Sequence, residues 1–163
     1  MPDEIRRDID GEAVVTKAIV DLLNEYPGLM TGETITFITL PEDGGIAMFP
    51  MSGAAIERET VDILGNHEQI CQYPFLVFYR SNGLSEGRKM DVKEWLDDLG
   101  RWLERQPITV GGVVSQLESY PVLTGNRSFL SIQRTSPASL DSLGENQSEN
   151  WVIRLNARYK NNF

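Results

Sequence analysis

The stretch from Tyr73 to Pro107 constrains the fold more than any other part of the chain. It opens with an apolar run, YPFLVFYR, whose aromatic and β-branched residues predict a strand. A short polar link containing Gly83 follows, and then apolar residues recur every three or four positions, which predicts an amphipathic helix. These apolar positions are Val92, Trp95, Leu96, Leu99, Trp102 and Leu103. A strand leading into such a helix predicts a helix packed against a sheet.

Large side chains of this unit are candidates for the structural core. Trp95 and Trp102 share the apolar stripe of the helix with Leu99, and Phe75 and Phe78 lie in the preceding strand. An indole buries on the order of 150–250 Å². We therefore expect the helix to pack on a sheet rather than bind a cofactor, and these five residues to belong to the structural core.

The N-terminal part predicts a helix followed by a hairpin. Apolar residues at helical spacing indicate a helix over residues 3–26. The run Thr34–Leu40 is rich in β-branched residues and predicts a strand. The turn residues of Pro41–Gly45 then predict a return into a second strand over Ile46–Phe49.

The middle of the chain predicts two more strands. Alternation of apolar and charged residues over Ile56–Leu64 predicts an exposed or edge strand, and Glu68–Arg80 predicts a long one. Pro74 has no amide hydrogen to donate, so we expect it at a bulge or a sheet edge. The segment Gly112–Leu123 is expected to hold a helical turn before a strand.

Two strands are predicted at the C-terminal end, over Asn126–Thr135 and Glu149–Lys160. The Ser-, Gly- and Asn-rich link Ser136–Ser148 predicts a mobile loop or a protruding arm. The order of elements predicts an α+β fold for a single domain spanning residues 1–163, with a mixed, largely antiparallel sheet and helices packed on one face.

The net charge is −9 and the sequence pI is about 4.6, which disfavours specific nucleic-acid binding. A charged N-terminus and the lack of a long apolar run predict neither a signal peptide nor a membrane span. The single cysteine, Cys71, permits no intrachain disulfide, so we expect a protein made in the cytoplasm.

Few residues offer chemistry. His67 and Cys71 lie four positions apart and are the one candidate nucleophile–base pair. The segment Asp8–Glu12 lacks the later ligands of a calcium loop, and the neighbours Asp97 and Asp98 are expected on the solvated face of their helix. No phosphate-binding loop or nucleophile elbow occurs. We therefore expect no enzyme, no catalytic or metal-binding residue and no cofactor.

Five segments in this order resemble the tail-terminator, or tail-completion, family of bacteriophages and phage-tail-like particles, also called minor capsid proteins. They are AIVDLL (Ala18–Leu23), ITFITLP (Ile35–Pro41), PFLVFYRSNG (Pro74–Gly83), EWLDDLGRWLERQP (Glu94–Pro107) and WVIRLNARYKN (Trp151–Asn161). The resemblance implies a structural virion protein, made in the host cytoplasm and located in the tail. It implies a homohexameric ring that caps the tail tube, stops its polymerisation and presents a surface to the head or neck.

The resemblance further implies contacts with other copies, with the tail tube protein and with sheath or head and neck connector proteins, while DNA passes through the ring. For these contacts we consider Glu42, Asp43, Arg58, Arg80 and Arg154. Three alternatives stay open. The first is a head-completion or neck connector ring, the second a small binding or catalytic α+β domain using a pocket around His67 and Cys71, and the third a monomeric adaptor that pairs an exposed strand with a partner.

Overall fold

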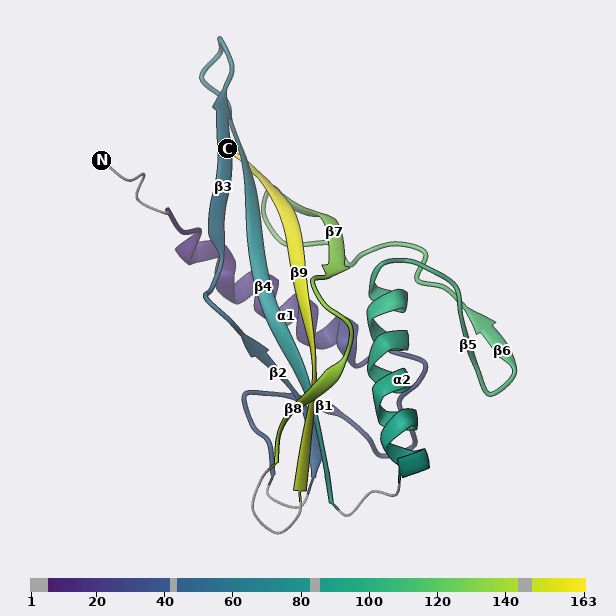
Figure 1. The fold of residues 1–163 in the computed structure, drawn as a ribbon. Coiled ribbons are helices and arrows are strands. Elements are labelled where there is room, and N and C mark those ends of the chain that lie inside the picture. The colour runs from purple at the N-terminus through teal and green to yellow at the C-terminus, as the bar shows by residue number, and fades with distance from the viewer. Residues whose placement is uncertain (1–5, 42–43, 83–85, 144–147) are drawn as a thin grey trace.

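The computed structural model describes residues 6–41, 44–82, 86–143 and 148–163. Its centre is a pair of long antiparallel strands, β4 (His67–Asn82) and β9 (Ser148–Asn162), which stay in register over their length (Figure 1). These two strands form the spine of a seven-stranded sheet. Shorter strands line the spine on both sides.

Each spine strand is bordered by two shorter strands placed end to end. Strands β2 (Gly45–Pro50) and β3 (Ala55–Val61) both pair with β4, and β7 (Arg127–Arg134) and β8 (Ser139–Leu143) both pair with β9. Strand β1 (Ile35–Phe37) adds to the outer edge of β2. All pairings except that of β1 with β2 are antiparallel.

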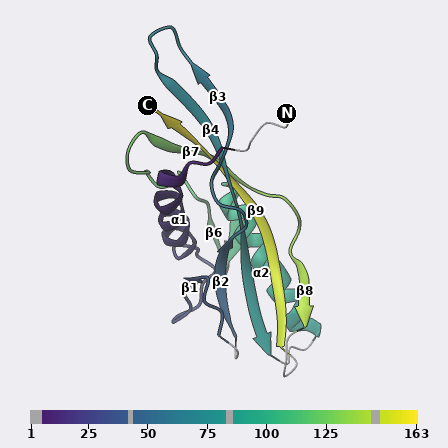
Figure 2. The same ribbon diagram turned by 90° about the vertical axis from the view of Figure 1, so that its left-hand side faces the viewer.

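Both helices, α1 (Ile9–Leu23) and α2 (Glu86–Leu103), pack on the same face of this sheet. Odd-numbered residues of β4 and β9 form that face. From α1, the Thr16 hydroxyl lies 2.6 Å from the hydroxyl of Tyr73. From α2, Gly100 lies against Ile153. Figure 2 shows α2 behind the sheet strands. The predicted α+β fold with helices on one face is confirmed.

Helix α1 is shorter than the described part of the expected span of 3–26, of which residues 3–5 lie outside the described residues. The Asp8 side chain caps its first turn by accepting a hydrogen bond from the backbone amide of Gly11 at 3.0 Å. Arg6 and Arg7, before this cap, pair with β3 instead: the Arg6 carbonyl accepts from the amide of Ile56, and Arg7 bridges to Ala55. The helix stops at Leu23, and the Asn24 side chain then bonds to the backbone of Ile35 in β1.

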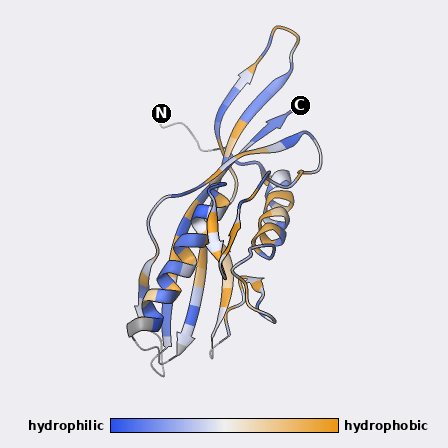
Figure 3. Cartoon of the chain, turned by 90° about the vertical axis from the view of Figure 1, so that its right-hand side faces the viewer, coloured by the Kyte–Doolittle hydropathy of each residue, from blue (hydrophilic) through white to orange (hydrophobic). Residues whose placement is uncertain are grey.

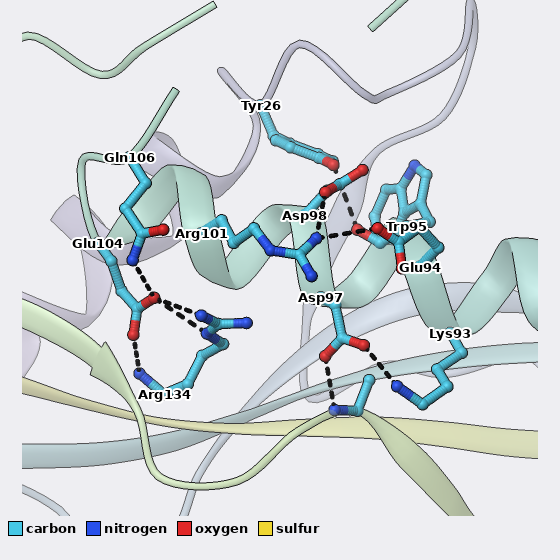
Figure 4. Close-up of polar contacts among 11 residues, drawn as sticks. Tyr26, Lys93, Glu94, Trp95, Asp97, Asp98, Arg101, Glu104, Gln106 and Arg134 are labelled. Atoms are coloured by element: carbon cyan, nitrogen blue, oxygen red, sulfur yellow. Dashed lines mark hydrogen bonds and ion pairs between the residues drawn. The ribbon is translucent and has the colours of Figure 1, made fainter. Parts of the chain in front are cut away.

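Two carboxylates, one within α2 and one just after its last residue, attach this helix to the sheet layer (Figure 4). Asp97 accepts from the backbone amide of Ala138 at 2.8 Å and from Lys93 at 2.6 Å. Glu104 pairs with the side chain and the backbone amide of Arg134. The expectation that Asp97 is solvated is wrong, because this side chain is buried between α2 and the segment before β8.

The first predicted hairpin is wrong in direction. Strands β1 and β2 run parallel, with Ile35 opposite Ile46. The chain leaves β1 through Ile38, which has a φ of 58°, and comes back to the start of β2. The Asn24 bonds to Ile35 hold β1 in this orientation. A turn signal between two strand-like runs does not show whether the two strands will pair in parallel or antiparallel.

Pro74 lies at neither a bulge of the β4–β9 ladder nor a sheet edge, contrary to expectation. In β4 it falls between the residues paired with β2 and those paired with β3. Its carbonyl accepts from Met51, in the connection between these two strands. Pro74 therefore lacks an amide hydrogen at the position where the neighbouring chain passes from β2 to β3.

Two predictions for the loops are also corrected. The segment Gly112–Leu123 forms no helical turn, and part of it builds a small hairpin of β5 (Ile108–Val110) and β6 (Val113–Ser115). The expected mobile loop Ser136–Ser148 contains strand β8, which pairs with β9. Residues 144–147 of that loop lie outside the described residues.

The expected core residues separate into two groups. Leu99, Trp102 and Phe75 are buried in the layer between helices and sheet, and Trp95 is half-buried at its margin. Trp95 donates to the carbonyl of Gly28 at 2.8 Å, so its indole nitrogen is satisfied. The expectation is wrong for Phe78, which is half-buried on the opposite face of the sheet because alternate residues of a strand point to opposite sides.

Candidate functional site

The face of the sheet opposite α1 and α2, here called the helix-free face, is the main candidate for a binding surface. Even-numbered residues of β4 and β9 form it. No helix in the described part of the chain covers it, and many of its side chains are only half-buried. A sheet face left without a covering layer in a small domain is a candidate contact surface.

Cations gather on this face, although the chain as a whole is acidic. The three arginines considered for subunit contacts, Arg58, Arg80 and Arg154, come from β3, β4 and β9, and the strand registers place them all on this side. Among the described residues, the charged side chains here are Arg58, Arg80, Arg154, Arg158 and Lys160, with the acids Glu57, Glu68 and Asp141. Basic residues outnumber acidic ones in this described set, whereas the whole chain is acidic.

Ion pairs within the helix-free face differ in length. Arg158 donates two hydrogen bonds to Glu57, at 3.2 and 3.4 Å, whereas Arg154 lies 3.7 Å from Asp141 and Lys160 lies 3.5 Å from Glu68. Arg58 is exposed and has no ion pair or hydrogen bond with any described side chain. Exposed pairs of this length contribute about 0–1 kcal/mol each. Arg58, Arg154 and Lys160 are therefore able to form better contacts with an acidic partner.

Arg80 differs from the other cations because its guanidinium is already engaged. It donates to the Asn150 side chain at 2.7 Å and to the carbonyls of Leu40 and Pro41 at 3.2 Å each. These bonds attach the segment after β1 to the spine of the sheet. Arg80 therefore supports the end of the helix-free face rather than offering a free charge.

An aromatic pair lies beside the cations. Phe49 of β2 and Phe78 of β4 meet edge to face with ring centroids 5.4 Å apart, and Leu76 is next to them on the same side. Aromatic residues and arginine together are the side chains most enriched at protein–protein interfaces. The helix-free face thus combines an apolar patch with surrounding cations.

On the helix side, a buried polar cluster forms around Asp8. Arg127 donates two hydrogen bonds to its carboxylate, each 2.9 Å long, and Tyr159 donates a third at 2.8 Å. Burial raises the pKa of Asp8, but these hydrogen bonds outweigh it and leave the pKa below its ordinary value. The cluster joins α1 to β7 and β9, and its acceptors are satisfied within the chain, so we assign it a structural role.

His67 and Cys71 are not brought together. Both lie in β4, and four residues along a strand correspond to roughly 13 Å. His67 bonds to Glu59 at 2.8 Å and stacks on Phe163. Cys71 is fully buried, and burial raises the pKa of its thiol to about 11, so the reactive thiolate is scarce near neutral pH. The pair that a catalytic interpretation requires is therefore not formed.

Three further expectations concern two acidic contact residues, metal binding and membrane spans. Glu42 and Asp43 lie outside the described residues. Within the described ranges, no group of three or more His, Cys, Asp or Glu side chains is arranged to hold a metal ion. The same ranges contain no helix of the length and apolarity that a membrane span requires.

Some surface residues were missed in the sequence. Arg158 and Lys160 lie on the same side of β9 as Arg154, four and six residues further along, and this even spacing was visible in the predicted strand. The turn joining β3 to β4 was also missed as a surface feature. Its two aliphatic residues, Ile63 and Leu64, are 102% and 82% exposed, although the sequence pattern placed them at the end of a strand.

Comparison of the chain with protein-family models and with curated proteins finds no match in either set.

Proposed function

We propose that this chain is a structural assembly subunit that forms a homohexameric ring on the end of a bacteriophage tail tube, or of the tube of a related particle. In this role it ends polymerisation of the tube and provides the attachment surface for the head or neck. The proposal takes its biological setting from the resemblance of the sequence to tail-terminator proteins. The helix-free face supplies the physical argument for assembly.

The observation that carries the proposal is the charge on that face. An acidic chain that gathers its cations beside an aromatic pair has one surface suited to the acidic remainder of another copy. Arg58 and Arg154 are the clearest contributors, since one has no partner among the described residues and the other has a weak one. Copies of the same chain can satisfy these charges without a second kind of protein.

The same charge argues against using this face as the wall of a DNA channel. A wall rich in cations would hold the phosphate backbone and slow its passage. A subunit contact instead neutralises the cations and leaves the acidic surface of each copy for the channel and the outside. We therefore assign the helix-free face to contacts between proteins.

A charge reversal tests this assignment. The double variant Arg58→Glu/Arg154→Glu should weaken self-association by about tenfold or more in sedimentation experiments, because cation–acid contacts become repulsive. Its melting temperature should stay close to that of the wild type, since neither side chain has a strong contact within the chain. The matched control, Arg58→Lys/Arg154→Lys, keeps the charge and should associate nearly normally. Equal association of the reversed and control variants would remove this face from the subunit contact.

A further inference from the structure

Strands β3 and β4 form an arm that extends beyond the rest of the sheet (Figure 1). The pairing of β4 with β9 ends at Glu68, so the turn after β3 has no neighbouring strand on that side. The turn carries Ile63 and Leu64 at the tip, and it is hydrophobic in Figure 3. An almost completely exposed aliphatic pair at the end of an arm is costly to leave in water.

The tip has a defined conformation. One carboxylate oxygen of Asp62 accepts from the backbone amides of Leu64 and Asn66, at 2.8 and 2.9 Å. The other accepts from the Asn66 side chain at 2.9 Å. Gly65, with a φ of 84°, completes the turn. Because the loop is already ordered, docking of the two aliphatic side chains requires little further loss of conformational entropy.

An apolar hollow of about 590 Å³ lies on the outer side of α1, next to β1. Its floor and walls include Ile9, Ala13, Val20 and Phe37, and charged residues stand at its rim. Ile9 is 78% exposed and Phe37 is 45% exposed. The hollow is thus a second unpartnered apolar surface, on an element distant from the tip of the arm.

The arm cannot place its tip in the hollow of its own chain. Ala55, at the base of the arm, bridges to Arg7 just before α1. Ile63 lies eight residues further along, which corresponds to roughly 26 Å of extended chain. Figure 1 shows the arm pointing away from α1. Any contact between tip and hollow must therefore join two copies.

The charges on the two surfaces are complementary. The acids of the arm are engaged within their own chain, by Arg158, Lys160, His67 and the turn at Asp62, whereas Arg58 has no described partner. On α1, Glu12 stands at the rim of the hollow without an ion pair to any described residue. Among the described residues, the arm therefore carries an unpaired cation and the rim of the hollow an unpaired acid, and these charges are opposite.

We propose that the β3–β4 arm of one copy docks on α1 of the next copy, with Ile63 and Leu64 in the apolar hollow and Arg58 toward the acids of the rim. This inference rests on the proposed ring and names one of its contacts. Arm and hollow are different patches, so the contact is head to tail, and a repeated contact of this kind closes into a ring or continues as a filament. A rigid arm restricts the angle between neighbours, which favours closure.

Cysteine cross-linking between two differently labelled chains tests the contact. Leu64→Cys is placed in one chain and Ala13→Cys in the other, since both positions are exposed and native Cys71 is buried. Mild oxidation of the mixture at high protein concentration should give a covalent heterodimer. The matched control replaces Ala13→Cys with Val113→Cys, which is 64% exposed on the β5–β6 hairpin and should give little product.

A second variant measures the strength of the contact. Ile63→Ser/Leu64→Ser should raise the dissociation constant of self-association by on the order of a hundredfold, because two aliphatic side chains lose their burial. The matched control is Val113→Ser/Val114→Ser, two exposed aliphatic residues on the other hairpin, which should associate normally. Asp62 is kept in both variants, so the turn is preserved.

The outcomes separate this contact from the proposed function. Rings that form while the 64–13 cross-link stays at the control level would overturn the arm contact and leave the ring intact. A chain that remains monomeric at every concentration, without cross-link, and that forms no ring on tail tubes would overturn both. Equal association of the tip variant and its hairpin control would also overturn the arm contact.

Discussion

Asp8 and Arg127, separated by most of the chain, form a two-bonded ion pair with both distances at 2.9 Å. Asp8 is also the N-cap of α1. A single carboxylate therefore fixes the start of α1 and holds this end against β7, while Tyr159 attaches it to β9. This relation explains why the segment before Asp8 joins the sheet instead of extending the helix.

Asp8→Asn should lower the free energy of unfolding by about 3–5 kcal/mol, because it removes the buried carboxylate and leaves the half-buried Arg127 without its counter-charge. Urea denaturation measures this change. The matched control is Asp21→Asn, which removes an exposed acid of the same helix from its pair with Lys17. The control should cost about 0.5 kcal/mol or less. Similar losses of unfolding free energy in the two variants would mean that the Asp8 cluster does not stabilise the attachment of α1 to the sheet.

Lowering the pH should reduce the difference in free energy of unfolding between the wild type and Asp8→Asn. The folded-state pKa of Asp8 lies below its ordinary value of 3.8. Its contribution to stability is therefore complete above that value and is lost as the pH falls through the folded-state pKa. Denaturation curves recorded from about pH 5 to about pH 2.5 should converge for the two proteins. A constant difference over this range would contradict the assigned pKa shift.

The long elements of the fold were predictable because hydrophobic periodicity is strong over many residues. Helix α2 and strands β4 and β9 were expected close to their observed positions. Short elements depend more on tertiary contacts. The side chain of Asn24 fixes β1, which then lies parallel to β2, and no local pattern specifies that bond.

One missed element had a signal in the sequence. Gly111 and Gly112 both have positive φ, at 57° and 80°, and they connect β5 and β6. A Gly-Gly pair between β-branched residues is typical of a two-residue hairpin turn. Strand β8 had no such signal, because Ser-rich composition resembles a loop and the pairing partner, β9, is the next element of the chain.

The surface was predictable in part. Arg58, Arg80 and Arg154 were selected as single charges, and only the register of the strands shows that they share one face. Period-two alternation in β9 would have added Arg158 and Lys160. To predict the exposed arm, one must know where β9 ends. Nothing within Ile56–Leu64 indicates that the last residues of this segment extend beyond the sheet.

The Cys71 thiol should react slowly in the folded protein. With a pKa of about 11 and no exposed surface, it should react with a thiol reagent at pH ~8 at least about a hundredfold more slowly than in urea. The urea-unfolded chain is the control for intrinsic reactivity. Rapid reaction without denaturant would show that β4 opens in the native state.

Separate variants of the two candidate chemical residues should leave assembly intact. His67→Ala loses the side-chain hydrogen bond to Glu59, which is half-buried, and Cys71→Ala loses one buried thiol. Both should retain wild-type association in sedimentation, with only a modest fall in melting temperature. Loss of assembly in a variant that keeps its fold would indicate a functional role for that residue.

Gly100→Ala should destabilise the protein even though alanine is the better helix former. An added Cβ would lie 2.3 Å from Cδ of Arg134 and 2.9 Å from Cδ1 of Ile153. Overpacking of this kind costs about 1–3 kcal/mol. Over most of this range the cost is larger than the gain in helix propensity, which is about 1 kcal/mol. Thermal unfolding measures the net change. A raised melting temperature would show that α2 can move away from the sheet at low cost.

The most direct test of the central claim is electron microscopy of the chain, alone at high concentration and mixed with tail tubes. We expect six-fold rings, either free or at the ends of tubes, because we propose that the helix-free face and the arm both contact another copy. Tubes should stop growing where a ring is bound. Monomeric particles together with bare tube ends under both conditions would contradict the claim that this chain is a ring-forming tail subunit.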